Sequence, residues 1–221
     1  MRCEVNPPPL DALPGLRRLP VRESAPFVLW LLDLRETPIR ELDRAFLSPD
    51  ELNRERDYRF QDDRDRFVAR RIVLRALLAG LQDRDPRHHS LASSGDLVLY
   101  GLTSLGSIGV DIEIDRGEPA SASLTRLALA PDERTALQAV PPRARARRFL
   151  EYWTLKESLA KASGVGLTRS PAGFSIGPDP HNARVRAGPD WPELQSASYE
   201  AELVTEIGGC VAAVATSHVG E

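Results

Sequence analysis

The sequence predicts an α+β protein made of two similar halves, each a small, mostly antiparallel sheet packed with helices. Short apolar runs typical of buried strands, amphipathic runs typical of helices, and a repeat of both at a fixed offset support this prediction. The expected divisions are an irregular N-terminal segment over 1–24, an N-terminal subdomain over 25–106 and a C-terminal subdomain over 107–221.

Composition bounds the class of protein. The 221 residues are 42% apolar and 28% charged, which is ordinary for a globular chain that can bury a core. A formal net charge of −3 argues against a general nucleic-acid binder, and no apolar run reaches the roughly 18 residues that a membrane span needs. The prolines near the N-terminus do not resemble a signal peptide, and two cysteines make no disulfide framework. We therefore expect a cytoplasmic protein with no nucleic-acid or membrane partner.

The first half begins with the apolar run Phe27–Asp33, which predicts a buried strand. Ser48 is a candidate N-cap, with proline next and Glu51 at the capping-box position. A strong amphipathic helix follows from Arg66 and ends near Gly80. Residues 81–95 are rich in polar and turn-forming residues, which predicts a loop.

The second half begins with two predicted strands, Leu97–Thr103 and Ile108–Asp115, whose tight connection predicts a hairpin. Proline and two acidic residues at 131–133 open a helix, and the longest helix is expected to begin at about Arg145 and to continue to Ser163. Four short runs separated by Pro/Gly loops predict the remaining strands, with the last two forming a hairpin; these runs are 174–177, 183–186, 198–204 and 210–216.

The repeat has an offset of 82 residues. The Leu-x-Pro-Asp-Glu run that ends at Glu51 recurs as the run that ends at Glu133, and Arg66-Phe67 recurs 82 residues later. The strand Phe27–Asp33 then falls on Gly109–Asp115 without a gap. Two copies of a strand–helix–helix unit are expected to pack together, with a ligand at the seam between them and a monomer as the favoured state.

The strand Gly109–Asp115 alternates strictly. Three apolar side chains are expected to face a core, and Asp111, Glu113 and Asp115 face the other way. These carboxylates are either an ordinary wet face of a sheet or a site for a hard cation such as Mg²⁺, which prefers oxygen ligands. No GxxxxGK[ST] loop and no GxGxxG are present, so the nucleotide folds that use them are excluded.

The long helix carries both lysines of the chain, Lys156 and Lys161; every other basic residue is an arginine. Glu157 and Lys161 are i,i+4 neighbours, which alone would favour no more than an ion pair on the surface of a core helix. Together with the acidic strand, these ammonium groups predict an anionic phosphate compound as the ligand.

Two motifs carry a family resemblance. Gly109-Val-Asp-Ile-Glu113 and, some forty residues on, Trp153-Thr-Leu-Lys-Glu-Ser-Leu-Ala-Lys161 resemble the signature of 4′-phosphopantetheinyl transferases of the surfactin-synthetase-activating type. The resemblance covers about residues 27–216. It implies a pseudo-dimer that binds coenzyme A and Mg²⁺ at the seam. It also implies transfer of 4′-phosphopantetheine to a serine of an apo acyl or peptidyl carrier protein, with release of 3′,5′-ADP.

The resemblance also implies roles for individual residues. Asp111, Glu113 and Glu157 look like the magnesium ligands, and Glu157 and Lys161 look catalytic. Lys161 matches the phosphate contact, with Lys156 as a weaker candidate.

Two further residues match family positions. Arg66 lies where the family places a basic residue on the 3′-phosphate of coenzyme A. Glu133 matches a glutamate proposed as general base or water holder; equally, it is a helix-start glutamate on the positive end of the helix dipole.

One segment departs from the family pattern. The usual Ser-His-Ser-Gly turn is replaced by Leu91-Ala-Ser-Ser-Gly95, and the segment before it is short. Ser93 or Ser94 is expected to supply a hydroxyl to coenzyme A, and His88 or His89 is a candidate substitute for the lost histidine. The alternatives are a repurposed, non-catalytic relative that binds a nucleotide or a carrier protein, or a plain structural domain whose carboxylate strand is merely wet.

Overall fold

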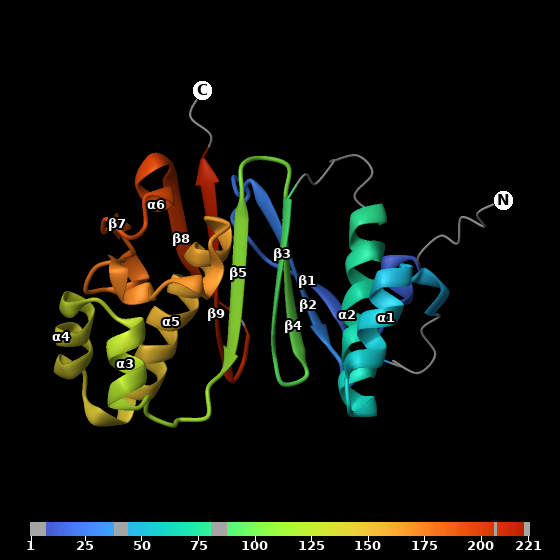
Figure 1. Ribbon diagram of the computed structural model, residues 1–221, viewed down its shortest axis with the longest axis horizontal. Helices are drawn as coiled ribbons and strands as arrows, with labels where there is room; N and C mark the ends of the chain where they lie inside the picture. The colour runs from blue at the N-terminus through green and yellow to red at the C-terminus, as the bar shows by residue number, and fades with distance from the viewer. Residues whose placement is uncertain (1–7, 38–43, 81–87, 206, 219–221) are drawn as a thin grey trace.

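The protein contains two antiparallel sheets that lie edge to edge (Figure 1). The computed structural model describes residues 8–37, 44–80, 88–205 and 207–218. The first sheet has the order β1-β2-β4-β3, and its strands are β1 (Leu16–Leu19), β2 (Phe27–Asp33), β3 (His88–Ser94) and β4 (Leu97–Thr103). The second has the order β5-β9-β8, formed by β5 (Ile108–Ile114), β8 (Ser198–Val204) and β9 (Cys210–His218). A two-stranded pair joins β6 (Phe174–Ser175) to β7 (Arg186–Ala187).

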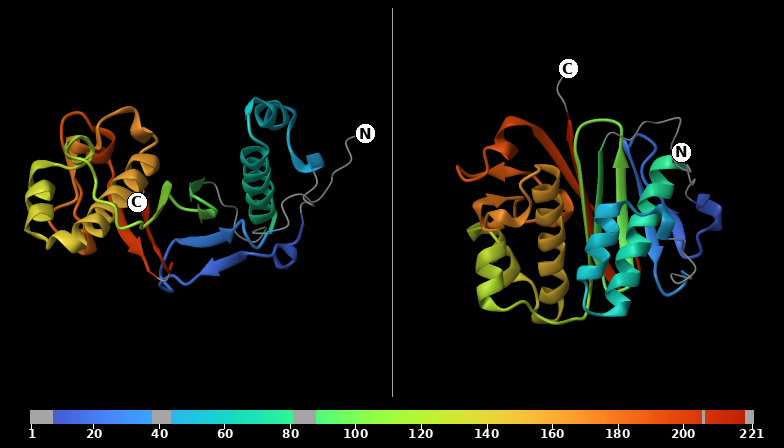
Figure 2. Two further views of the ribbon diagram at one scale, coloured as in Figure 1. Left: turned by 90° about the horizontal axis from the view of Figure 1, so that it is seen from below. Right: turned by 45° about the vertical axis from the view of Figure 1, so that its right-hand side comes forward.

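One long helix covers each sheet, and the two long helices lie on the same side of the molecule (Figure 2). The helices are α1 (Pro49–Asp57), α2 (Gln61–Gly80), α3 (Ala122–Ala128), α4 (Pro131–Ala139), α5 (Arg145–Ala162) and the short α6 (Glu193–Ser196). α2 packs on the first sheet and α5 on the second. In the part of the chain that the structure describes, no helix is long and apolar enough to cross a membrane.

The duplication expected from the sequence is present in the topology. The strand order β2-β4-β3 of the first half matches β5-β9-β8 of the second, and α1 and α2 correspond to α4 and α5. The α+β fold with two similar halves is therefore confirmed.

The ungapped offset of 82 is wrong for the strands. α1 and α4 begin at residues 49 and 131, which are 82 apart, but β2 and β5 begin at 27 and 108, which are 81 apart. Because strand side chains alternate, a slip of one residue exchanges the two faces. The buried faces of the two strands agree with an offset of 81 residues. Leu29 and Leu31 of β2 lie in one buried cluster with Val110 and Ile112 of β5, between the two halves.

Three local expectations also need correction. β3 replaces the second half of the loop predicted over 81–95, and residues 81–87 lie outside the described residues. β4 and β5 do not form a hairpin, because β4 already pairs with β2 on one edge and β3 on the other. β1 lies in the N-terminal segment that was expected to be irregular, and it extends the sheet beside β2.

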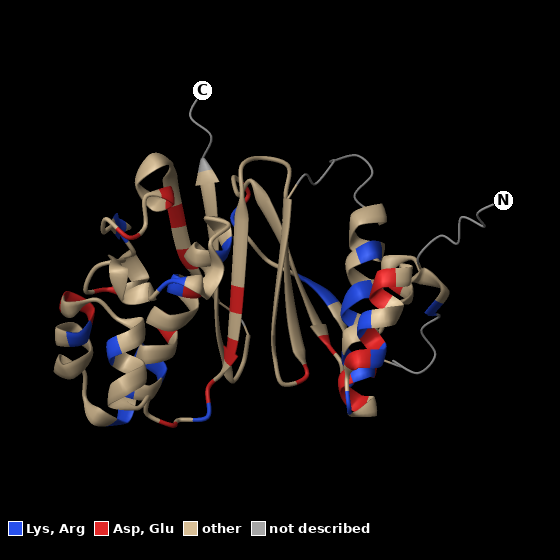
Figure 3. Ribbon diagram, in the orientation of Figure 1, with Lys and Arg blue, Asp and Glu red and all other residues tan. Residues whose placement is uncertain are grey.

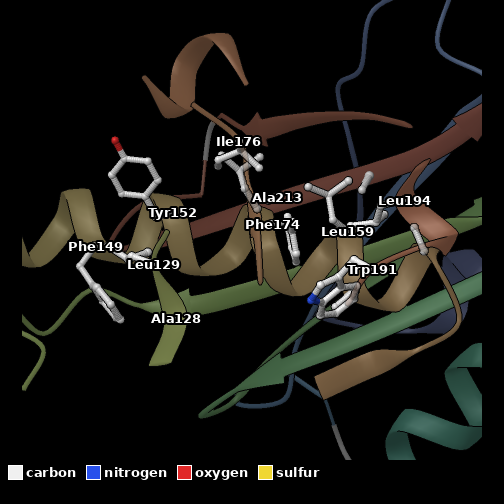
Figure 4. Packing of buried hydrophobic residues seen from close by; sticks show 14 of the residues in the cluster. Ala128, Leu129, Phe149, Tyr152, Leu159, Phe174, Ile176, Trp191, Leu194 and Ala213 are labelled. Atoms are coloured by element: carbon white, nitrogen blue, oxygen red, sulfur yellow. The ribbon is translucent and has the colours of Figure 1, made fainter. Parts of the chain in front are cut away.

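The core of the second half is built around α5 (Figure 4). Phe174 and Trp191 pack edge to face with ring centroids 4.8 Å apart, and both are buried beneath the helix. Ala213 and Ala215 of β9 belong to the same buried cluster. This packing anchors α5 so that its opposite flank faces β5.

Candidate active site

The site is formed where β5 approaches α5 closely at Gly109. A Cβ at Gly109 would lie 2.0 Å from the backbone oxygen of Ser158 and 2.6 Å from the backbone nitrogen of Ala162. Any larger residue would push the helix away, so glycine permits the contact. Two residues further along β5, Asp111 projects from the same face of the strand beside the last turns of α5.

Lys161 joins the strand to the helix. Its Nζ donates to Asp111 Oδ1 at 2.8 Å and to the backbone oxygen of Val110 at 3.0 Å. The same atom lies 3.6 Å from Glu157 Oε2. One ammonium group therefore serves two carboxylates from different elements.

Burial and mutual repulsion perturb both carboxylates. Burial raises the pKa of Asp111 to about 7; the Lys161 charge opposes this rise, and the charges of Glu157 and Glu113 reinforce it. The pKa of Glu157 is also raised by burial, against the effect of Lys161 and with that of Glu113. Acidic groups that perturb one another's pKa values are typical of functional sites.

Glu113 is held from the other half of the molecule. Ser94, the last residue of β3, donates its hydroxyl proton to Glu113 Oε2 at 2.9 Å. The same hydroxyl oxygen accepts the backbone N–H of Ile114 at 3.1 Å. Figure 3 shows acidic positions on a β5 ribbon that otherwise carries no charge.

The donor set fits a hard cation. Asp111 Oδ2 is buried and has no hydrogen-bond partner among the described residues, so one carboxylate oxygen is left to be satisfied. The neighbouring donors, Glu113 and Glu157, are also oxygen ligands of the type that Mg²⁺ prefers. Over the described ranges, however, no three His, Cys, Asp or Glu side chains are already grouped closely enough to hold a metal ion.

Glu133 and Lys156 are not brought to this cluster. Both side chains are 0% exposed, and Lys156 Nζ donates to Glu133 Oε2 at 2.5 Å and to the backbone oxygen of Phe174 at 2.7 Å. Glu133 also accepts the backbone N–H groups of Ala130 and Ile176. Burial lowers the pKa of Lys156, although the Glu133 charge opposes that effect. The expected roles of Lys156 on a phosphate and of Glu133 as a base therefore find no support in their positions.

Arg66 is largely neutralised. Its Nη2 donates to Asp96 Oδ1 at 2.8 Å, and its Nη1 lies 3.8 Å from Asp63. One turn later on α2, Arg70 Nη1 donates to Ser93 Oγ at 3.0 Å. Among the described residues, no carboxylate pairs with Arg70. The cation of α2 that is available to an anion beside the β3–β4 turn is thus Arg70, at i+4 from Arg66.

Comparison with known proteins identifies the family. The family model described as "4'-phosphopantetheinyl transferase superfamily" matches residues 107–215. The 4'-phosphopantetheinyl transferase HetI of Nostoc sp. (strain PCC 7120) is 30% identical over 213 residues, which cover 86% of each protein. The chain belongs to the 4′-phosphopantetheinyl transferase superfamily.

Two further matches cover less of this chain. A putative 4'-phosphopantetheinyl transferase of Synechocystis sp. (strain PCC 6803) is 32% identical over 57% of this chain and 60% of its own. A solved structure described as the "Chronobacterium ammoniagenes ACPS-CoA complex" overlaps 52% of this chain and 97% of its own, with 18% identity and a TM-score of 0.40. That structural likeness is too distant to inform the site.

The altered turn is where this member of the superfamily departs from sequence expectation. His88 and His89 lie at the start of β3, opposite Thr103 and Leu102. Ser93, which takes the place of the missing histidine, lies five residues beyond His88 and four beyond His89. At 3.3 Å per residue these separations are roughly 17 and 13 Å, so neither histidine folds back to replace the missing one.

Sequence reasoning missed the two hydrogen bonds that organise this turn. The contact of Ser94 with Glu113 depends on the side-by-side placement of β3 and β5, which no local pattern reveals. Arg70 could have been found, because a row of arginines at helical spacing marks one flank of α2.

Proposed function

We propose that this protein transfers 4′-phosphopantetheine from coenzyme A to a serine of an apo acyl or peptidyl carrier protein and releases 3′,5′-ADP. The observation that carries the proposal is the buried Asp111, tied to Lys161 and flanked by Glu157 and Glu113, where β5 meets α5. Superfamily membership and the match to HetI over 86% of both chains support the same activity.

The residues suit phosphoryl transfer, which depends on positioning and charge neutralisation more than on covalent help. The serine oxygen of the carrier forms a bond to phosphorus as the pyrophosphate P–O bond breaks. The serine proton passes to a carboxylate or to water, and 3′,5′-ADP leaves with the electron pair. Lys161, held between Asp111 and Glu157, is the ammonium that balances the negative charge on the departing phosphate.

Asp111, Glu113 and Glu157 are the residues that would hold Mg²⁺. When bound, the ion would neutralise the pyrophosphate of coenzyme A and orient it. The buried Oδ2 of Asp111, which has no hydrogen-bond partner among the described residues, supports this assignment, because Mg²⁺ prefers oxygen ligands.

Arg70 and Ser93 are the proposed contacts for the 3′-phosphate of coenzyme A, in place of the expected Arg66. This assignment rests on charge: Asp96 and Asp63 neutralise Arg66, whereas Arg70 makes no carboxylate contact in the described chain. Ser94 is no longer proposed as a coenzyme contact, because its hydroxyl both donates and accepts within the protein.

The surfactin-synthetase-activating subtype remains part of the proposal. Two halves within one chain, facing each other across β3 and β5, suit a protein that acts as a monomer. A cytoplasmic location likewise stays a prediction.

A second candidate is a relative that binds coenzyme A or a carrier protein without catalysis. The altered turn favours it, because the first serine and the histidine of the usual turn are replaced by Ala92 and Ser93. The hydroxyl groups of Ser93 and Ser94 are also both engaged by protein groups.

The test is incubation with coenzyme A, Mg²⁺ and a panel of apo carrier proteins, followed by intact mass spectrometry. Addition of one phosphopantetheine to the carrier serine is expected. If the protein binds Mg²⁺ and 3′,5′-ADP in calorimetry but modifies no carrier, the second candidate replaces the first.

A further inference from the structure

The seam between the halves is joined by side chains rather than by a backbone ladder. β3 belongs to the first sheet and β5 to the second, and they are not paired with one another. Two serines of β3 make the connection instead: Ser90 Oγ accepts the backbone N–H of Val110 at 3.1 Å, and Ser94 Oγ accepts that of Ile114 at 3.1 Å. The serines are four residues apart, as are their partners, so both pairs share one face of each strand.

The two serines differ in one respect. A hydroxyl that accepts an N–H retains its own proton for donation. Ser94 gives that proton to Glu113 Oε2 at 2.9 Å, whereas Ser90 has no carboxylate partner among the described residues. Hydrogen bonds to a charged acceptor are about twice as strong as neutral ones, so the Ser94 contact fixes where Glu113 points.

We propose that Ser94 is a positioning residue through which the first half sets the orientation of Glu113 for divalent-cation binding by the second half. The proposal rests on the proposed function, in which Glu113 is one of three magnesium ligands. A ligand carboxylate held by a second hydrogen bond loses less freedom on binding, and removing such a partner typically costs 10–100-fold in metal affinity.

The hydrogen bonds of Ser94 give this serine a role that differs from the one the family resemblance implies. Ser94 was expected to serve coenzyme A, yet both hydrogen-bonding functions of its hydroxyl are already used inside the protein. Gly95, which follows Ser94 with a φ of 57°, permits this approach, because a Cβ there would lie 2.7 Å from Ile114 Cδ1 of β5.

The test compares two substitutions of nearly equal shape, Ser94→Thr and Ser94→Val. Both suit a strand, but only threonine keeps the hydroxyl. The first readout is the dissociation constant for Mn²⁺, measured by electron paramagnetic resonance in the presence of saturating 3′,5′-ADP. The Mg²⁺ concentration for half-maximal carrier modification is the second. Ser94→Val should weaken cation binding at least about tenfold, and Ser94→Thr should stay within about threefold of wild type.

Ser90→Ala is the matched control, because it removes the other seam hydrogen bond and touches no carboxylate. It should lower the unfolding midpoint but leave Mn²⁺ affinity within about twofold of wild type. Equal Mn²⁺ affinities for the Thr and Val variants, or equal losses in Ser90→Ala and Ser94→Val, overturn the proposal.

The two hypotheses fail differently. If no carrier is modified by wild type, the proposed function fails, yet the Mn²⁺ measurement still decides the role of Ser94. If carriers are modified and the Ser94 variants bind Mn²⁺ alike, only the positioning role is lost.

Discussion

Lys156 and Lys161 are five residues apart on α5, and their surroundings differ completely. The side chain of Lys156 is 0% exposed and paired with Glu133, whereas that of Lys161 is 30% exposed between Asp111 and Glu157. The family motif ranks Lys161 above Lys156 as the phosphate contact, but helical spacing does not show which of the two side chains is buried. The structure separates them through burial.

Lys161→Arg should lower kcat/KM for carrier modification by at least about tenfold, or about 1.4 kcal/mol. The Nζ atom meets Asp111 and the Val110 carbonyl within 3.0 Å, and a planar guanidinium cannot place its donors in the same way. Steady-state kinetics measure the change. Arg169→Lys, on a surface pair with Glu193, is the control and should leave kcat/KM unchanged. Near-normal turnover in Lys161→Arg contradicts the role given to this ammonium.

Glu133→Gln and Lys156→Met should each lower the free energy of unfolding by about 3–5 kcal/mol, because each leaves one partner of a buried pair uncompensated. The double variant should lose less than the sum of the two. Urea unfolding measures all three. If Glu133→Gln keeps wild-type stability but abolishes transfer, then Glu133 is the base that the family resemblance suggested, and the structural account is wrong.

At the scale of elements, strands and helices with strong patterns were predictable, and polar or paired ones were not. The capping box at Ser48 and Glu51 is present, and α5 begins at the expected Arg145. β3 was missed because its sequence, HHSLASS, lacks the apolar alternation that marks a strand. Its position comes from pairing with β4, which is tertiary information.

The approach of β5 to α5 at Gly109 gives a test at this scale. Gly109→Ala should destabilise the protein by about 1–3 kcal/mol, because the new methyl group meets the backbone of Ser158 and Ala162. It should also lower kcat, because it would increase the distance between the Asp111 carboxylate and the Lys161 ammonium group. Gly208→Ala is the control, since nothing lies within 4 Å of a Cβ there. Thermal unfolding and kinetics check both variants; equal effects of the two substitutions refute the close-packing argument.

At the scale of the whole molecule, the two halves repeat one ion-pair arrangement. In each, a glutamate at the start of a helix accepts from its own N-terminal turn and pairs with a cation on the following long helix. Glu51 pairs with Arg71 and Arg75, as Glu133 pairs with Lys156. The recurrence in both halves favours a structural role for this contact, and the sequence repeat at offset 82 had already aligned the two glutamates.

The ion pairs of Glu51 predict a pH dependence of stability. Burial alone would raise the pKa of Glu51, but the Ser48 amide and the two arginines lower it to about 2. A carboxyl whose folded pKa lies below its unfolded value stabilises the fold above the unfolded pKa, and this contribution is lost as pH falls toward 2. The difference in unfolding free energy between wild type and Glu51→Gln should therefore shrink by about 1–2 kcal/mol as pH falls from 5 toward 2, allowing for partial exposure of the arginines.

Urea titrations at several pH values measure that difference. Asn53→Ala, at an exposed and uncharged position of the same helix, should run parallel to wild type. Parallel curves for Glu51→Gln and wild type would show that the glutamate does not stabilise the fold through its charge.

The strand offset of 81 and the helix offset of 82 have one last consequence. The first-half counterparts of Asp111, Glu113 and Glu157 are Trp30, Leu32 and Arg75, none of which binds a hard cation. The duplicated fold is therefore expected to contain one cation-binding site, in the second half. Titration with coenzyme A and Mg²⁺ should saturate at one equivalent per chain along a simple hyperbola, with no cooperativity between the two lobes.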